Sequence, residues 1–193
     1  MIHERRFDPK SAHKLEAADR GQQFPVEIIL DAAEVRSGQT VADIGAGSGY
    51  FALPLARRVE PATVYAVEPS DELRKRLQGK LAEAGAPANV EPVHGESNAT
   101  GLPPASCDLV FLSAVWHEID NHEAALREFW RITAPGAKLA MVDWSPDAAP
   151  PPGPPHSHRI PHQQIEHALE QAGWSVVMSG ALTDWTYMVV AQR

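Results

Sequence analysis

The chain has 193 residues, of which 44% are apolar and 22% charged, as in one soluble domain with a full-sized core. Its formal net charge is −8 and no run of lysine and arginine stands out, which disfavours nucleic acid as a partner. A single cysteine excludes an internal disulfide, and neither a secretory signal nor an apolar stretch of membrane-spanning length is present. We therefore expect a cytoplasmic protein without membrane insertion.

The N-terminal part of the chain is polar and irregular as far as residue 24, with a short helix expected around Ser11–Asp19. After Pro25, apolar residues at helical spacing predict a second helix. We expect these segments to form a helical cap over residues 1–37, followed by the main domain over residues 38–193.

Short apolar runs alternate with helical patterns along the main domain. The expected strands are TVADI (40–44), TVYAVE (63–68), NVEPVH (89–94), CDLVFLS (107–113), AKLAMVDW (137–144) and a closing pair, WSVVMS (174–179) and WTYMVVAQ (185–192). The expected helices run from Ser48 to Val59, from the cap Ser70 to about Ala84, from Asp120 and Glu123 in capping-box spacing past Phe129, and from Pro161 to Ala172.

The segment between the fifth strand and the last helix holds seven prolines from Pro146 to Pro161. Proline removes backbone donors, so the segment is expected to be an extended loop or flap over residues 146–161, without a helix. Three histidines, at 156, 158 and 162, lie close together at its end. A loop rich in proline does not fix their geometry and no carboxylate or cysteine spacing supports them, so no metal site is predicted.

Alternation of strand and helix with continuously apolar strands predicts a parallel sheet covered on both faces. Ligands of such sheets bind at the carboxyl ends of the strands. Three acids, Asp43, Glu68 and Asp143, end their strands and should gather along that edge.

The turn after the first strand reads D-x-G-x-G-x-G from Asp43 to Gly49. The dinucleotide fingerprint needs a third glycine at the position that Tyr50 occupies, and the phosphate-binding loop of kinase-type enzymes needs a lysine after the last glycine. The turn therefore argues against a dinucleotide cofactor, and an NAD(P)-dependent oxidoreductase is kept only as a less favoured alternative function.

The glycine turn followed by an acid at the next strand end resembles motifs I and II of the class I S-adenosylmethionine-dependent methyltransferases. The likeness extends across nearly the whole chain and is closest to the small enzymes of ubiquinone and menaquinone biosynthesis. It implies an α/β fold, with a Rossmann-like seven-stranded, mostly parallel sheet, helices on both faces and an antiparallel last strand. It also implies S-adenosylmethionine as cofactor, held by Asp43, Gly45, Ala46, Gly47, Gly49, Glu68, Pro69, Glu96, Ser97 and Ser113.

Two of these roles follow the chemistry of the cofactor. Glu68 has two acceptor oxygens that match a ribose diol. Glu96 stands where the family places an acid that accepts from the adenine amino group. The spacing leaves Glu96, Ser97 and Asn98 open as alternatives for that position.

The family positions its methyl acceptor at the end of the fourth strand, SAVWHEI (113–119). His117 is the candidate base, because an imidazole titrates near neutral pH, although it could instead pack over the cofactor. The other residues expected to face the acceptor are Glu118, Asp143, His156, His158 and Arg20.

Missing motifs narrow the acceptor to a small molecule methylated without a metal. The fourth strand lacks the N/D-P-P-Y/F run of methylases that act on exocyclic or amide nitrogens, and an acid cluster with asparagine is absent. A catalytically idle relative that keeps the cofactor pocket remains the alternative. The sequence does not predict the oligomeric state.

Overall fold

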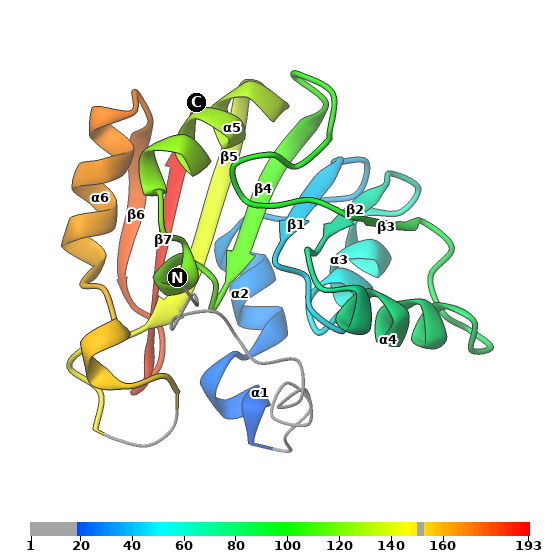
Figure 1. Ribbon diagram of the computed structural model, residues 1–193, viewed down its shortest axis with the longest axis horizontal. Coiled ribbons are helices and arrows are strands. Elements are labelled where there is room, and N and C mark those ends of the chain that lie inside the picture. Colours follow the sequence, from blue (N-terminus) through cyan, green and yellow to red (C-terminus); the bar gives the residue numbers. More distant parts are fainter. Residues whose placement is uncertain (1–18, 150–152) are drawn as a thin grey trace.

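The computed structural model describes residues 19–149 and 153–193, which fold around one seven-stranded sheet (Figure 1). The helix expected around residues 11–19 therefore falls almost entirely outside the described residues.

The strands are β1 (Val41–Ile44), β2 (Val64–Val67), β3 (Val90–Val93), β4 (Cys107–Ser113), β5 (Thr133–Trp144), β6 (Ser175–Ala181) and β7 (Thr186–Gln192). The helices are α1 (Arg20–Gln23), α2 (Val26–Ala32), α3 (Ala52–Val59), α4 (Asp71–Leu81), α5 (His122–Ile132) and α6 (His162–Gln171), with 3-10 turns η2 (Trp116–Glu118) and η3 (His156–His158).

The order of the strands in the sheet is β3-β2-β1-β4-β5-β7-β6. All neighbours from β3 to β5 are parallel, whereas β7 is antiparallel to both β5 and β6. The predicted fold class, including the antiparallel last strand, is confirmed. The strand order reverses between β1 and β4, and ligands of such sheets bind at the carboxyl ends of the strands at this point.

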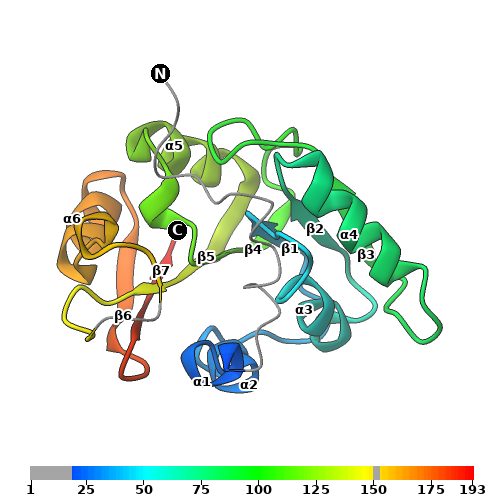
Figure 2. The same ribbon diagram turned by 60° about the horizontal axis from the view of Figure 1, so that its bottom comes forward.

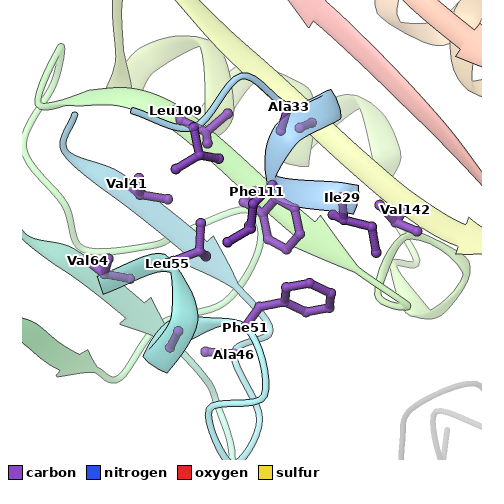
Figure 3. Close-up of a cluster of buried hydrophobic side chains, with 14 of the residues drawn as sticks. Ile29, Ala33, Val41, Ala46, Phe51, Leu55, Val64, Leu109, Phe111 and Val142 are labelled. Carbon is purple, nitrogen blue, oxygen red and sulfur yellow. The ribbon is translucent and has the colours of Figure 1, made fainter. Parts of the chain in front are cut away.

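Helices cover both faces of the sheet, with α5 and α6 on one side and α2 and α3 on the other (Figure 2). A hydrophobic core lies on each face of the sheet, and the side chains of β4 alternate between the two. Leu109 and Phe111 pack in the first core with α2 and α3. Val110 and Leu112 pack in the second core with α5 and α6. In the first core, Phe51 and Phe111 pack with ring centroids 4.9 Å apart (Figure 3).

The N-terminal helix α2 belongs to this first core. Its Ile29 and Leu30 are fully buried, and the ring of Phe24, just before α2, meets Trp144 of β5 edge-on with centroids 5.0 Å apart. The helix predicted after Pro25 is therefore confirmed. The division of the chain at residue 37 stays a prediction.

Helix α3 begins later than predicted, at Ala52 and not at Ser48. The cause lies in the turn before it, where Gly47 and Gly49 have φ of 56° and 90°. Left-handed backbone cannot continue a right-handed helix, so the helix begins only after the last glycine.

Helix α5 has a different cap from the one predicted. The Oδ1 atom of Asn121, not Asp120, accepts from the backbone N–H of Ala124 at 2.9 Å. The cap predicted for α4 is confirmed, because the Ser70 hydroxyl accepts from Leu73 N–H.

The proline-rich segment departs from its prediction in one respect. It contains the short 3-10 turn η3, so the expectation of no helix was wrong there. Pro155 stands just before this turn, at a place where proline interrupts no helical hydrogen bond.

Candidate functional site

Glu68, at the end of β2, holds the glycine turn. One of its carboxylate oxygens accepts from Gly47 N–H and the other from Ser70 N–H, both at 2.9 Å. Burial raises the pKa of Glu68, and these backbone bonds and Arg74 oppose the rise. Each oxygen keeps a second lone pair, so the carboxylate can still receive two further donors.

Two glycines of the turn are required by packing as well as by backbone shape. A Cβ atom on Gly45 would lie 2.5 Å from Val115 Cγ2, and one on Gly49 would lie 2.6 Å from Leu77 Cδ1. Their φ values of 69° and 90° disfavour other residues too. Side chains of the protein itself therefore lie close against the turn at these two positions.

Asp43, at the end of β1, is a buried carboxyl that lacks a full set of partners. It is 2% exposed, and its Oδ2 has no hydrogen-bond partner among the described residues. Burial, followed by the charge of Glu68, raises the pKa of Asp43 to about 8. At neutral pH the carboxyl is therefore mostly protonated, and a cationic or donor group placed beside it would favour its ionised form.

The remaining predicted cofactor residues lie around this turn. Glu96 pairs its backbone with Ala99 in a tight bridge, and its charge helps to raise the pKa of Glu68, so the two acids are close. Ser97 is half-buried, whereas Asn98 is exposed. Which of the three meets the adenine stays a prediction.

Three further predicted cofactor residues are placed by backbone contacts and burial. The Ala46 N–H donates to the carbonyl of Val67 at 3.1 Å, and Ala46 lies in the first core. Pro69 is half-buried beside Glu68. Ser113, at the end of β4, has a buried Oγ with no hydrogen-bond partner within the described ranges.

The segment after β4 turns sharply toward the glycine turn. Ala114 adopts φ of 56°, unusual for a residue with a side chain, and its N–H donates to the carbonyl of Val142 at 2.8 Å. The next residue, Val115, packs on Gly45. The predicted cofactor and acceptor segments therefore come together.

His117, in η2, is held by Asp143 of β5. Its Nδ1 lies 2.7 Å from Asp143 Oδ1, and its backbone N–H donates to Asp143 Oδ2 at 3.1 Å. The exposed fractions are 4% for His117 and 2% for Asp143. Since an ionised carboxylate only accepts, Nδ1 carries a proton and Nε2 is the nitrogen that can exchange one.

The electrostatic surroundings of His117 are mixed. Burial lowers the pKa of its imidazole, but Asp143 and then Glu118 oppose burial, and the net direction is upward. The positive charge of Arg159 lowers the pKa of His117, whereas Asp143 raises it. Glu118 Oε1 lies 3.7 Å from Nε2, so the exchangeable nitrogen faces a second carboxylate.

The other residues predicted to face the acceptor are more dispersed. His156 is exposed, with its Nε2 3.2 Å from the carbonyl of Ala148 in the same segment, and His158 is half-buried. Arg20, at the start of α1, lies over the ring of Tyr50 beside the glycine turn. Whether these residues contact an acceptor stays a prediction.

Arg159 is the residue that the sequence analysis missed. Only 7% exposed, it donates to the carbonyls of Pro154, Ser145 and Ala148 and lies 6.0 Å from the ring of Trp144. It therefore ties the described parts of the predicted flap to the end of β5. An arginine among prolines looks like a surface residue in sequence, so no signal pointed to this role.

Within residues 19–149 and 153–193, no three histidine, cysteine or acidic side chains lie close enough together to hold a metal ion. None of the helices in this part of the chain is long and apolar enough to cross a membrane.

Comparison with known proteins identifies the fold and the family. Residues 42–141, just over half of the chain, match the methyltransferase domain family. The chain belongs to the S-adenosylmethionine-dependent methyltransferases. A solved S-adenosylmethionine-dependent methyltransferase from Aquifex aeolicus is 29% identical, with a TM-score of 0.91 over 97% of this chain and 99% of that one.

Two further matches define the limits of this assignment. The ubiquinone/menaquinone biosynthesis C-methyltransferase UbiE of Enterobacter sp. (strain 638) is 30% identical over 117 residues, which are 60% of this methyltransferase and 47% of the relative. The chain thus spans about half the length of such relatives. The [4+2]-cyclase SpnF shares the fold alone, at 16% identity and a TM-score of 0.78 over 92% of this chain and 81% of that one.

The residues at the glycine turn suit this cofactor. S-adenosylmethionine carries an ammonium, a sulfonium and a ribose diol but no phosphate. Two buried carboxyls, one with an oxygen lacking a partner among the described residues, match such a ligand better than they match a pyrophosphate. The predicted resemblance and cofactor are confirmed.

Proposed function

We propose that this protein transfers a methyl group from S-adenosylmethionine to a small-molecule acceptor without the help of a metal. When bound, the cofactor supplies a methyl group already activated on a sulfonium. The chain has to hold the acceptor in line and keep water out, and it needs a base only if the acceptor must lose a proton.

We assign Glu68 to the ribose diol and Asp43 to the cationic side of the cofactor. The remaining lone pairs of Glu68 and the unpartnered Oδ2 of Asp43 support these roles. The other predicted contacts around the turn, from Gly45 to Ser113, complete the proposed pocket.

One observation carries the catalytic part of the proposal: the contact between His117 and Asp143 next to the glycine turn. In this arrangement Asp143 is a positioning residue, since its oxygens accept from His117 and from the backbone N–H of Trp144. With Nδ1 protonated, Nε2 of a neutral His117 can accept a proton from an acceptor group.

This role fixes the expected direction of the pH dependence. A base must be unprotonated, and the surroundings raise the pKa of His117. The rate should therefore rise with pH through the titration of His117 and level off above it.

The relatives and the candidate base both indicate a class of acceptor. The named activity of the UbiE relatives is C-methylation in ubiquinone and menaquinone biosynthesis. A base at His117 is compatible with a phenol or quinol, whose hydroxyl loses its proton as the ring becomes nucleophilic. We propose such ring compounds as the first acceptors to test; a cytoplasmic location and the absence of nucleic-acid binding stay predictions.

The test is transfer of a labelled methyl group to a panel of quinols, phenols, amines and thiols, with and without a chelator. Turnover on at least one compound, unaffected by the chelator, is the expected result. The His117→Ala variant should lose most of this turnover and keep its affinity for S-adenosylhomocysteine. His167→Ala, at an exposed position of α6, is the matched control.

Two outcomes oppose the proposal. Cofactor binding without turnover on any compound would favour the alternative, a catalytically idle relative that keeps the cofactor pocket. Unaltered kinetics in His117→Ala would return His117 to a packing role.

A further inference from the structure

The second ring nitrogen of His117 faces a carboxylate of its own. The side chain of His117 is 5% exposed, and Nδ1 lies 2.7 Å from Asp143 Oδ1. The other nitrogen, Nε2, lies 3.7 Å from Glu118 Oε1. A proton that His117 accepts at Nε2 is therefore held close to Glu118.

The two carboxylates beside His117 differ in their access to water. The side chain of Glu118 is 22% exposed, whereas that of Asp143 is 2% exposed. The backbone N–H of Glu118 donates to the carbonyl of Val115 at 2.9 Å, which fixes the turn that carries both His117 and Glu118. Of the two carboxylates, Glu118 is thus the one that connects the buried imidazole to solvent.

The distance between Nε2 and Glu118 Oε1 suits a contact that depends on protonation. At 3.7 Å it exceeds a hydrogen bond. A neutral His117 with its proton on Nδ1 has a lone pair on Nε2, which a carboxylate oxygen repels. Once Nε2 holds a proton, the imidazolium attracts the carboxylate, and a shift of about 1 Å brings the two atoms to hydrogen-bond distance.

The charged groups that act on His117 come from three parts of the chain. Asp143 belongs to β5, Glu118 to η2, and Arg159 lies between η3 and α6. The two carboxylates favour the imidazolium, while the positive charge of Arg159 disfavours it. Arg159 therefore promotes the onward transfer of a proton that His117 has taken up.

We propose that Glu118 stabilises the imidazolium form of His117 during methyl transfer and carries its proton to solvent, an inference that rests on the proposed function. The acceptor loses its bond to hydrogen and uses that electron pair to bind the methyl carbon, while sulfur keeps the pair of its broken bond. The released proton goes to Nε2 of His117, then to a carboxylate oxygen of Glu118, and then to water.

This assignment replaces the direct contact with the acceptor that the sequence predicted for Glu118. Because Glu118 acts through His117, it is a positioning residue. A direct contact would instead hold the acceptor and would not depend on the protonation of His117. The two roles differ in what the loss of the carboxylate changes: the rate in the first case and the affinity for the acceptor in the second.

The first measurement needs no acceptor. NMR titration of histidine-labelled protein follows the imidazole of His117, whose signal is assigned by its loss in His117→Ala. Glu118→Gln keeps the shape of the side chain without its charge, and it should lower the pKa of His117 by about 1. Glu170→Gln, at an exposed position of α6, is the matched control and should leave that pKa within about 0.2.

The second measurement uses labelled S-adenosylmethionine and a quinol or phenol that the wild-type protein methylates. Glu118→Gln should lower kcat by about 10-fold and leave the KM for that acceptor within about three-fold. The acidic limb of its pH–rate profile should move to lower pH, in step with the titration of His117. Glu118→Asp, which keeps a carboxylate, should fall between, and Glu170→Gln should match the wild-type protein.

The contrary results are distinct. A pKa of His117 that moves by less than about 0.3 in Glu118→Gln, or a loss that appears in the KM for the acceptor and not in kcat, would each overturn the assignment. Glu118→Asp keeps the test open if the glutamine variant fails to fold. Failure of the wild-type protein to methylate any compound would instead remove the proposed function, while the NMR titration would still decide whether Glu118 acts on His117.

Discussion

Replacing Asp43 by asparagine should remove the effect of pH on stability at one buried site. In the unfolded chain the carboxyl ionises near its ordinary pKa of 3.8, whereas in the folded protein its pKa is about 8. Between these values the folded state holds a proton that the unfolded state has lost. The free energy of unfolding must therefore fall as pH rises through this window.

The magnitude follows from the width of the window. One proton changes the free energy of unfolding by about 1.4 kcal/mol per pH unit, so Asp43 should remove about 3–4 kcal/mol between pH 5 and pH 8. Asparagine does not ionise, so Asp43→Asn should gain this amount relative to the wild-type protein over the same range.

Urea unfolding at pH 5, 6, 7 and 8 measures this difference directly. Asp184→Asn, at an exposed position between β6 and β7, provides the control and should run parallel to the wild-type protein. If Asp43→Asn also ran parallel, within about 0.5 kcal/mol, Asp43 would be ionised in the folded state and the reasoning would fail. Asp43→Asn should also bind S-adenosylhomocysteine more weakly at pH 8, although the variant is relatively more stable there.

Three other predictions follow from single contacts. Glu68→Ala should weaken S-adenosylhomocysteine binding by about 2–3 kcal/mol in a calorimetric titration, and unchanged affinity would remove Glu68 from the site. Asp143→Asn should lower the pKa of His117, moving the acidic limb of the pH–rate profile to lower pH; an unmoved limb would contradict the contact. Arg159→Met should destabilise the fold by about 2–4 kcal/mol in urea unfolding, because it removes three hydrogen bonds from a buried guanidinium to backbone carbonyls; a loss below about 0.5 kcal/mol would contradict this.

The strands were predictable because their apolar runs are continuous and several end at an acid. Cys107–Ser113 is the expected β4, residue for residue, and the acids Asp43 and Glu68 are close enough to influence each other, as a parallel sheet requires. The helices were less predictable at their ends, since Gly47 and Gly49 delay α3 through backbone geometry that composition alone does not specify.

The contacts that define the site were harder to predict. The hydrogen bond between His117 and Asp143 joins residues 26 positions apart. It depends on the left-handed backbone conformation of Ala114, which an alanine in the sequence does not predict. Arg159 reaches Trp144 only because the proline-rich segment folds back on β5. Such contacts come from the path of loops, where hydrophobic periodicity gives no information.

The central claim is a cleft that binds an adenosyl ligand without phosphate beside the buried acids of β1 and β2. Calorimetric titration of the wild-type protein with S-adenosylhomocysteine, and in parallel with NADH, tests it most directly. We expect saturable binding of one S-adenosylhomocysteine per chain and no heat of binding for NADH. Binding of NADH with no response to S-adenosylhomocysteine would contradict the account.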